Sequence, residues 1–490
     1  MNVRNFADFK SFLLDNKTVK QTIFKNTFWL AVAEGISRLL KLVLLIYVAR
    51  ILGATEYGKF TFALAFVSLF AIFSDFGLSS IITREFSREK EKEKEFSPVF
   101  SLKILLSIGA LILILIGSFF VTPDPVIQKV IWILAIYIIV SGFSEIIYAF
   151  LRARQRMEYE AWAKILQAVV VTGAGFFIIL SFPSVQNLSY SYLFASLAAL
   201  IFILIFFHFK VYHLHINWNK LIWKRFLLMS WPLALVTISY TIYTNTDSVM
   251  MGYWGQMTQT GWYNAAYKII GVTLVPVGII LQSFFPVLSK AFKESKEQLQ
   301  KVWNYQMGIM TLIGVPLVAG GIALAPRIID LVYGLNFSPS IFAFQILIIM
   351  SGIAFLHAPF NQALVVSDQQ KKLFWATIST AMVNIILNLI LIPRYSLYGA
   401  ATATVITYFL IFLLLFKFTS KYTSINPLNL KVLFVFIGAI FSSTIMYFAV
   451  SQTKIYYLNI FLSILIGIVI YLVCLFAYRK LAYQIFIHLK

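Results

Sequence analysis

Charged side chains are scarce in this sequence. Asp, Glu, Lys and Arg together make up 12% of its 490 residues, whereas a soluble globular domain carries roughly 25%. Hydrophobic residues make up 60%. Apolar runs of about twenty residues recur along the chain, and each is long enough to cross roughly 30 Å of hydrocarbon. The composition therefore excludes an ordinary soluble domain and predicts a polytopic membrane protein.

Several chemical signatures are also missing. The sequence has no Gly-rich loop followed by Lys and Ser or Thr, which argues against ATP hydrolysis by this chain. The five histidines and the single cysteine, Cys474, lack the spacing of metal ligands. The predicted outer loops are too short to hold an extracytoplasmic catalytic domain. We therefore expect no metal site and no cofactor, and we expect that the chain is not an enzyme.

The basic residues indicate how the chain is oriented. Hydropathy, with breaks at Gly, Pro and charge clusters, predicts about fourteen spans, an even number that places both termini on one side. Most of the 40 Lys and Arg residues fall on the side of the N-terminus, and the positive-inside rule makes that side cytoplasmic. The net charge of +21 is thus mainly a topology signal, and nucleic acid is not an expected partner. We predict a multi-pass protein of the cell membrane with cytoplasmic termini.

Two pairs of similar segments indicate an internal repeat. Leu52–Phe60 resembles Trp254–Tyr263, and Ala149–Gln155 resembles Ala363–Gln369. Such repeats in transporters mark structurally equivalent halves. We therefore predict an all-α integral membrane fold with two pseudo-symmetric six-helix lobes and an appended C-terminal helix pair. The predicted parts are an N-terminal interfacial helix, the first lobe, the second lobe, and the helix pair with its tail, at residues 1–25, 26–212, 213–420 and 421–490.

Basic residues inside the predicted spans are candidates for a functional site, because a charge in hydrocarbon costs a few kcal/mol. Glu34, Arg38 and Lys41 share one face of the first span, and Arg38 lies about 15 Å deep in it. Lys268 lies on a stripe of the eighth span with Asn264. Two simpler interpretations stay open. Glu34 could neutralise Arg38 at a helix contact, which leaves Lys41 unexplained, and Lys268 could snorkel outward.

The acidic residues in the spans have two interpretations. Asp247 ends a hydroxyl-rich face of the seventh span, which favours contact with water over contact with lipid. Asp75, Glu145 and Glu34 could bind a coupling ion, either H+ or Na+. Asp75 and Glu145 could equally pair with Lys or Arg of a neighbouring helix, for instance Glu145 with Lys164, and we favour pairing.

Five segments carry a resemblance to a known family. Val48–Phe60 and Ser74–Leu78 resemble the opening of the Wzx-type polysaccharide biosynthesis flippases of the multidrug/oligosaccharidyl-lipid/polysaccharide (MOP) exporter superfamily, and Asn245–Asp247, Gly261–Lys268 and Phe285–Ser289 are similar too. The resemblance implies two six-helix lobes around a central cavity and a groove for a lipid tail at the appended pair. It also implies a substrate. That substrate is a polyprenyl-diphosphate-linked oligosaccharide, such as an O-antigen repeat unit, moved from the cytoplasmic to the outer leaflet.

The resemblance also implies roles for the charged residues. Basic residues in the first and eighth helices of the family match Arg38, Lys41 and Lys268, which would contact the diphosphate. A lysine at position 268 leaves bidentate recognition there open. The implied mechanism is alternating access, coupled to an ion or to the membrane potential. The further substrate-binding candidates are Glu34, Asn264 and Asp247.

Other functions stay open from the sequence. A lipid II flippase is one alternative. A cation-coupled multidrug antiporter of the MATE type would use Glu34, Asp75 and Asp247 as binding acids, and the basic residues argue against it. A membrane glycosyltransferase or polymerase would need a long outer loop or an acidic metal-binding motif, and neither is present. Expected partners are the lipid-linked oligosaccharide, membrane lipids and polysaccharide polymerase or assembly proteins, and we expect a monomer.

Overall fold

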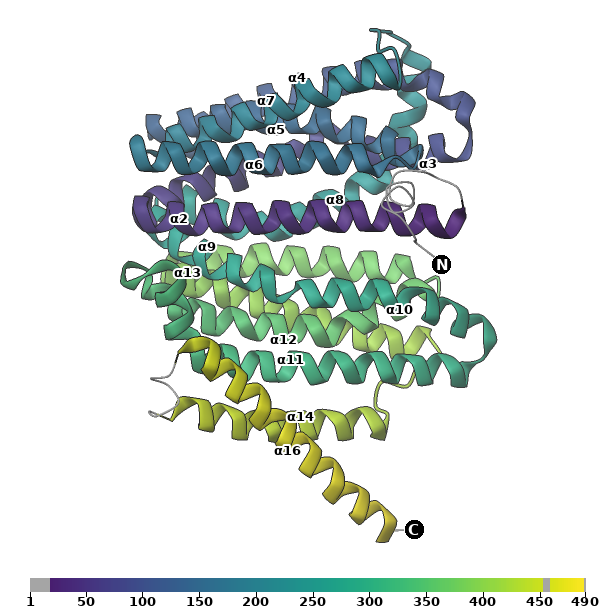
Figure 1. Ribbon diagram of the computed structural model, residues 1–490, viewed down its shortest axis with the longest axis vertical. Coiled ribbons are helices and arrows are strands. Elements are labelled where there is room, and N and C mark those ends of the chain that lie inside the picture. Colours follow the sequence, from purple (N-terminus) through teal and green to yellow (C-terminus); the bar gives the residue numbers. More distant parts are fainter. Residues whose placement is uncertain (1–17, 453–458, 489–490) are drawn as a thin grey trace, which may run out of the picture. The chain divides into compact units, whose positions relative to one another are not determined.

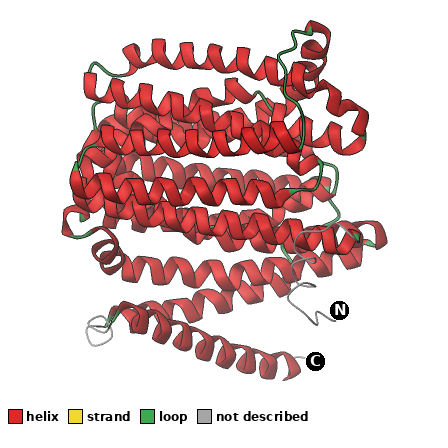
Figure 2. Cartoon of the chain, turned by 45° about the horizontal axis from the view of Figure 1, so that its top comes forward, coloured by secondary structure: helices red, strands yellow, loops and turns green. Residues whose placement is uncertain are grey.

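The chain forms long helices joined by short turns. The computed structural model describes residues 18–452 and 459–488, and this part contains helices and no strand (Figure 2). Most of the predicted interfacial helix, residues 1–17, lies outside the described residues. The prediction of an all-α membrane fold is confirmed.

Two compact units divide the chain between Thr258 and Gln259. In the first unit, helix α8 packs against α2, α3 and α4, whereas the sequence-based division assigned this segment to the second lobe. The boundaries of the functional lobes therefore stay a prediction. The helices of the first unit (Figure 1) are α2 (Val19–Asp75), α3 (Leu78–Arg88), η1 (Lys90–Glu95), α4 (Phe96–Val121), α5 (Pro125–Ala153), α6 (Met157–Ser181), α7 (Val185–Lys210) and α8 (Lys220–Tyr253).

The second unit contains the remaining helices. Its appended helices, α14 and α16, pack against each other, and α14 also packs along α11. Tyr471 of α16 donates a hydrogen bond to the carbonyl oxygen of Leu312 at 3.1 Å, which fastens α16 to α11. The helices are α9 (Met257–Thr273), α10 (Val275–Glu294), α11 (Lys296–Tyr333), η2 (Leu335–Phe337), α12 (Pro339–Val366), α13 (Gln370–Tyr422), α14 (Leu430–Ser451) and α16 (Ile460–His488).

Two of the helices are too long for one membrane crossing. Helix α2 has 57 residues, about 85 Å at 1.5 Å per residue, and it breaks at Gly53 (φ 78°, ψ 174°), a conformation that glycine adopts without strain. Helix α13 has 53 residues and breaks at Ser396. In the described part, eleven helices are long and apolar enough to cross a membrane, or twelve with the bent α8. If α2 and α13, which each contain a break, count as two crossings each, the total rises from twelve to the predicted fourteen.

Aromatic side chains hold one end of the first unit together. Phe86, Phe96, Phe150, Phe207 and Phe226 are buried and come from five different helices. Phe150 lies 4.8 Å from Phe96 and 5.0 Å from Phe207 between ring centroids. Edge-to-face pairs of this kind contribute about 0.5–1.5 kcal/mol each beyond their buried area. This cluster fixes the ends of α3, α5 and α7, where a cavity described below lies.

The turns after α5 and α12 support the internal repeat. Gln155 and Asp368 both adopt φ 57°. The amide of Gln155 donates to the carbonyl of Arg152, and that of Asp368 donates to the carbonyl of Val365. Gln155 therefore corresponds to Asp368, one residue earlier than the match with Gln369 made from the sequence. Residue identity alone could not set this register.

Gly399 of α13 supplies a prediction about stability. A Cβ atom at this position would lie 2.3 Å from the carbonyl oxygen of Leu391, which is backbone and cannot rotate away. We expect Gly399→Ala to lower the free energy of unfolding in detergent by about 1–3 kcal/mol. Gly109→Ala is the matched control, because a Cβ there has no atom within 4 Å, and it should stabilise α4 by about 0.5–1 kcal/mol. Equal stabilities for the two variants would contradict this packing.

Candidate functional site

The charged face of α2 is open in the first unit. Arg38 Nε donates to Glu34 Oε1 at 2.7 Å, and the two side chains are 66% and 49% exposed. The interpretation that Glu34 neutralises Arg38 is thus right about the pairing. However, within the first unit the pair is not enclosed in a helix contact. An exposed pair of this kind stabilises a fold by roughly 0–1 kcal/mol. The pair with Glu34 uses only one of the five N–H donors of the guanidinium.

A contact with α6 fixes this part of α2. The hydroxyl of Ser37 is buried and donates to the carbonyl oxygen of Lys164 at 3.3 Å. Lys41 follows Arg38 by about one turn and is half-buried. The contact between Ser37 and α6 fixes the rotation of α2 about its axis, and so the direction in which Arg38 and Lys41 point. This is consistent with the prediction that Glu34, Arg38 and Lys41 share one face of the helix.

The other predicted substrate residues are divided between the units. Asp247 is buried in α8 of the first unit. Lys268 is half-buried and Asn264 is buried in α9 of the second unit. Asn264 Nδ2 donates to the carbonyl oxygen of Thr260 at 2.9 Å, so one of its donors is already used within α9. Convergence of these residues with Arg38 on one ligand stays a prediction.

Asp75 has a cationic partner inside the protein. Lys103 Nζ of α4 lies 3.4 Å from Asp75 Oδ1 and 3.1 Å from Ser74 Oγ, and the Lys103 side chain is 1% exposed. Ser79 also donates to Asp75 at 2.6 Å. The favoured interpretation that Asp75 pairs with a Lys or Arg of a neighbouring helix is thus confirmed, but Lys103 was not identified from the sequence as the partner. Its position seven residues into an apolar helix was the available signal.

Glu145 also has a cationic partner, but not the one given as an example. It pairs with Arg152 of its own helix. Lys164 instead pairs with the fully buried Glu160, at 2.8 Å, and Arg152 reaches the same carboxylate at 3.1 Å. The specific pairing of Glu145 with Lys164 is therefore wrong. Lys164 of α6 and Arg152, near the end of α5, both contact the carboxylate of Glu160 instead. Binding of a coupling ion by Asp75, Glu145 or Glu34 stays a prediction.

An apolar groove lies in the second unit beside the appended helices. Its volume is about 610 Å³, and α11, α12 and α14 line it. The lining is almost entirely hydrocarbon, including Val318, Ile349, Ile440 and Phe448, with Ser443, Thr444 and Tyr447 as the hydroxyl-bearing members. A groove with this lining can accept an alkyl or isoprenoid chain, and none of its lining residues is charged.

Residues 23–292 match the family described as polysaccharide biosynthesis protein, which is more than half of the chain. The chain belongs to this family. The resemblance derived from the sequence is thus confirmed at the level of this family, and the family match extends from α2 to α10.

Curated relatives of this family member come from archaea and bacteria. It is 24% identical over 392 residues to the probable low-salt glycan biosynthesis flippase Agl15 of Haloferax volcanii, covering 78% of this chain and 80% of that protein. It is 22% identical over 399 residues to the capsular polysaccharide biosynthesis protein CapF of Staphylococcus aureus, covering 79% and 96%.

Solved structures support the fold alone. The lipid II flippase MurJ in an inward closed conformation has a TM-score of 0.73 at 18% identity, covering 93% of this chain and 99% of that one. An inward-facing multidrug resistance transporter of the MATE family, described as a member of the MOP superfamily, has a TM-score of 0.63 at 16% identity, covering 78% of this chain and 96% of that one. Both comparisons show that this family member shares the helical fold of these two proteins.

Proposed function

We propose that this chain translocates a polyprenyl-diphosphate-linked oligosaccharide, a repeat unit of a surface polysaccharide, from the cytoplasmic to the outer leaflet. The observation that carries the proposal is the exposure of Arg38 on an apolar membrane helix, where its ion-pair partner among the described residues is Glu34, itself 49% exposed. A guanidinium in this setting is suited to a phosphate oxygen, because charge-assisted bonds to phosphate are strong and directional.

The apolar groove supports the lipid part of the proposed substrate. A polyprenyl chain is all hydrocarbon, and the groove between α11, α12 and α14 presents mainly hydrocarbon over about 610 Å³. In this proposal the chain of the lipid stays in the groove or in the bilayer. Arg38, Lys41 and Lys268 hold the diphosphate, while Glu34, Asn264 and Asp247 orient the headgroup.

The proposed mechanism is alternating access. The two lobes rock about the bound headgroup, and the cations release it when the cavity opens outward. A proton, a sodium ion or the membrane potential drives the cycle, with Glu34, Asp75 and Glu145 as the candidate ion ligands. The proposal includes the cell membrane as location, cytoplasmic termini, a monomer as the working unit, and polysaccharide polymerase or assembly proteins as partners.

Complementation of a flippase-null strain tests the proposal. We expect Arg38→Ala and Lys41→Ala each to slow transport about ten- to hundredfold, because a hydrogen bond to a charged group is worth about 1.5–3 kcal/mol. Both variants should still insert, since the Arg38 pair is exposed. Arg88→Ala is the matched control, because Arg88 is 67% exposed and lies at the end of α3. Normal growth of both variants, with membrane levels equal to the control, would contradict the cationic-site model.

Two alternative substrates follow from the solved structures of similar fold. A lipid II flippase would rescue a strain that lacks its own lipid II flippase, whereas a surface-polysaccharide flippase would not. A cation-coupled multidrug antiporter would lower the accumulation of a cationic dye in cells, and the open Arg38 argues against it. The same variants can be tested in the flippase-null strain, in the strain that lacks its lipid II flippase and in the dye-accumulation assay. Together these three assays distinguish a surface-polysaccharide precursor, lipid II and a cationic drug as the substrate.

A further inference from the structure

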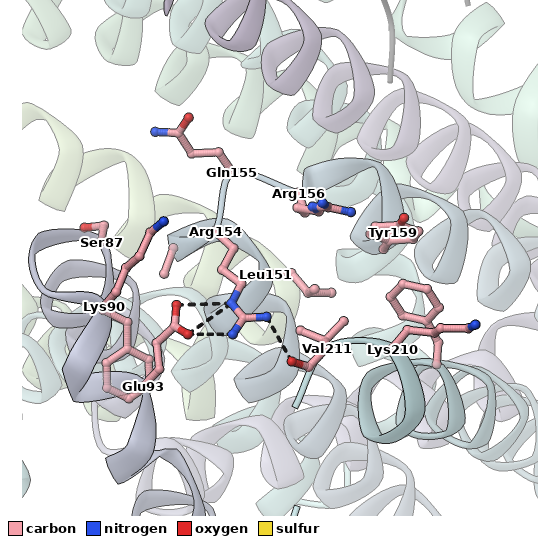
Figure 3. Close-up of a pocket in the computed structure, with 13 residues that line it drawn as sticks. Ser87, Lys90, Glu93, Leu151, Arg154, Gln155, Arg156, Tyr159, Lys210 and Val211 are labelled. Atoms are coloured by element: carbon pink, nitrogen blue, oxygen red, sulfur yellow. Dashed lines mark hydrogen bonds and ion pairs between the residues drawn. The ribbon is translucent and has the colours of Figure 1, made fainter. Parts of the chain in front are cut away.

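A cavity in the described part of the chain lies entirely in the first unit. Its volume is about 910 Å³. Three segments meet around it, the end of α3 with η1, the turn between α5 and α6, and the end of α7 (Figure 3). The positive-inside distribution predicts this end of the unit to be cytoplasmic. The proposed transport function assigns no role to this cavity.

One of the four basic residues that line this cavity is held by the protein. Arg154 Nη2 lies 2.5 Å from Glu93 Oε2, and Arg154 Nη1 donates to the carbonyl oxygen of Val211 at 2.9 Å (Figure 3). The guanidinium also lies over the ring of Phe150, 4.7 Å from its centroid. These contacts fix Arg154 and neutralise Glu93, the one carboxylate in the cavity lining.

The other three cations form no ion pair with the residues that the structure describes. Lys90, Arg156 and Lys210 line the cavity and are exposed, and no carboxylate of the described residues forms an ion pair with any of them. Three like charges around one cavity repel one another. An anion bound between them would remove that repulsion and gain charge-assisted hydrogen bonds.

The wall of the cavity is apolar beneath this basic rim. Phe86, Leu151, Phe206 and the ring of Tyr159 line it, and the rings of Tyr159 and Phe206 pack at 4.1 Å between centroids. Basic pockets between membrane helices on the cytoplasmic side bind the headgroups of anionic lipids. An apolar wall next to three cations suits such an amphiphile better than a fully hydrated ion.

The second unit has a smaller cavity at the equivalent place of the repeat. Its volume is about 480 Å³, and it includes Ser367 of the turn after α12 and Lys421 near the end of α13. Lys296, which begins α11, also lines it. The turn corresponds to that at Gln155, and Lys421, like Lys210, lies near the C-terminus of its helix. Both repeats therefore place lysines around a cavity beside the same turn.

We propose that the cavity at Lys90, Arg156 and Lys210 is a binding site for a phosphate group. The phosphate belongs either to an anionic phospholipid of the adjacent leaflet or to a soluble phosphate compound. The three cations contact the phosphate oxygens, and the apolar wall contacts the carbon skeleton attached to them. The site is separate from Arg38 and Lys41, and it exists whether or not the chain transports a lipid-linked oligosaccharide.

Equilibrium binding to the purified full-length protein in an uncharged detergent tests the site. The probes are dihexanoyl phosphatidic acid, which is soluble and carries a lipid phosphate, and inorganic diphosphate, with dihexanoyl phosphatidylcholine as the zwitterionic comparison. The variant Lys90→Gln/Lys210→Gln removes two of the three free cations. The variant Lys220→Gln/Lys224→Gln is its matched control, because those lysines are exposed at the start of α8 and lie outside the cavity.

We expect the cavity variant to bind the anionic probe about thirtyfold more weakly than the wild type, at about 1 kcal/mol per cation. The control should bind as the wild type does. Tighter binding of phosphatidic acid than of diphosphate would identify a lipid as the source, and the reverse order would identify a soluble phosphate. Equal binding by both double variants, or no preference for either anionic probe over phosphatidylcholine, would overturn the proposal. Arg156→Gln, which changes a third position, should weaken binding in the same direction.

Discussion

Lys25→Met should destabilise the protein by about 3–5 kcal/mol, because it removes one partner of a fully buried ion pair. Lys25 Nζ of α2 lies 3.0 Å from Glu158 Oε2 of α6, and the side chains are 0% and 6% exposed. Lys25 also donates to the carbonyl oxygen of Gln155 at 3.3 Å. Without this lysine, a carboxylate would remain inside the protein with neither water nor a cation beside it. Equilibrium unfolding of the purified protein in detergent measures the loss.

Two further variants separate the buried charge from the lost packing. Lys25→Met/Glu158→Gln removes both charges and should recover most of the stability, since a buried pair replaced as a whole is close to neutral. Lys59→Met is the matched control, because Lys59 pairs with Glu56 at 2.7 Å but both side chains are part-exposed, and it should cost no more than about 1 kcal/mol. If Lys25→Met is no more destabilising than Lys59→Met, the buried pair is not what fastens α2 to α6.

Asp75→Asn should have an effect of similar size. It leaves the ammonium group of Lys103, which is 1% exposed, with the hydroxyl of Ser74 at 3.1 Å but without its carboxylate. An unpaired buried charge of this kind costs about 3–5 kcal/mol. The free energy of unfolding should recover in Asp75→Asn/Lys103→Met. Asp124→Asn serves as the control, because Asp124 caps α5 through Val126 and asparagine caps a helix equally well.

The same variants bear on the predicted coupling ion. If Asp75 has only a structural role, the double variant Asp75→Asn/Lys103→Met should be both stable and active in transport. If Asp75 also binds a coupling ion, the double variant should be stable but inactive. If Asp75→Asn is as stable as the wild type, the contact between α2 and α4 does not depend on the pair of Asp75 with Lys103.

The membrane fold could be predicted because it depends on properties that are local in the sequence. Runs of about twenty apolar residues are needed wherever a helix crosses hydrocarbon, so the fourteen spans follow from hydropathy. The break at Gly53 could also be anticipated, since glycine readily takes a positive φ. The exact register of the repeat could not, because it depends on the hydrogen bonds of the turns at Gln155 and Asp368.

The ionic contacts could be predicted only in part. Glu34 and Arg38 pair across one helical turn, and this spacing is visible in the sequence. Arg154 and Glu93 are 61 residues apart, and Lys25 and Glu158 come from α2 and α6. Such partners are chosen by the packing of helices, so no local pattern identifies them. The basic cavity was missed for the same reason, because three separate segments build it.

Translocation in reconstituted vesicles tests the central claim most directly. Vesicles are loaded with a labelled polyprenyl-diphosphate oligosaccharide, and the fraction of label that reaches the outer leaflet is measured with an impermeant reagent. Wild-type protein and Arg38→Ala/Lys268→Ala are compared with Arg88→Ala at equal protein levels. The account predicts rapid translocation by the wild type and by Arg88→Ala, and at least a tenfold slower rate for the double variant. No translocation by the wild type, or an unchanged rate in the double variant, would contradict it.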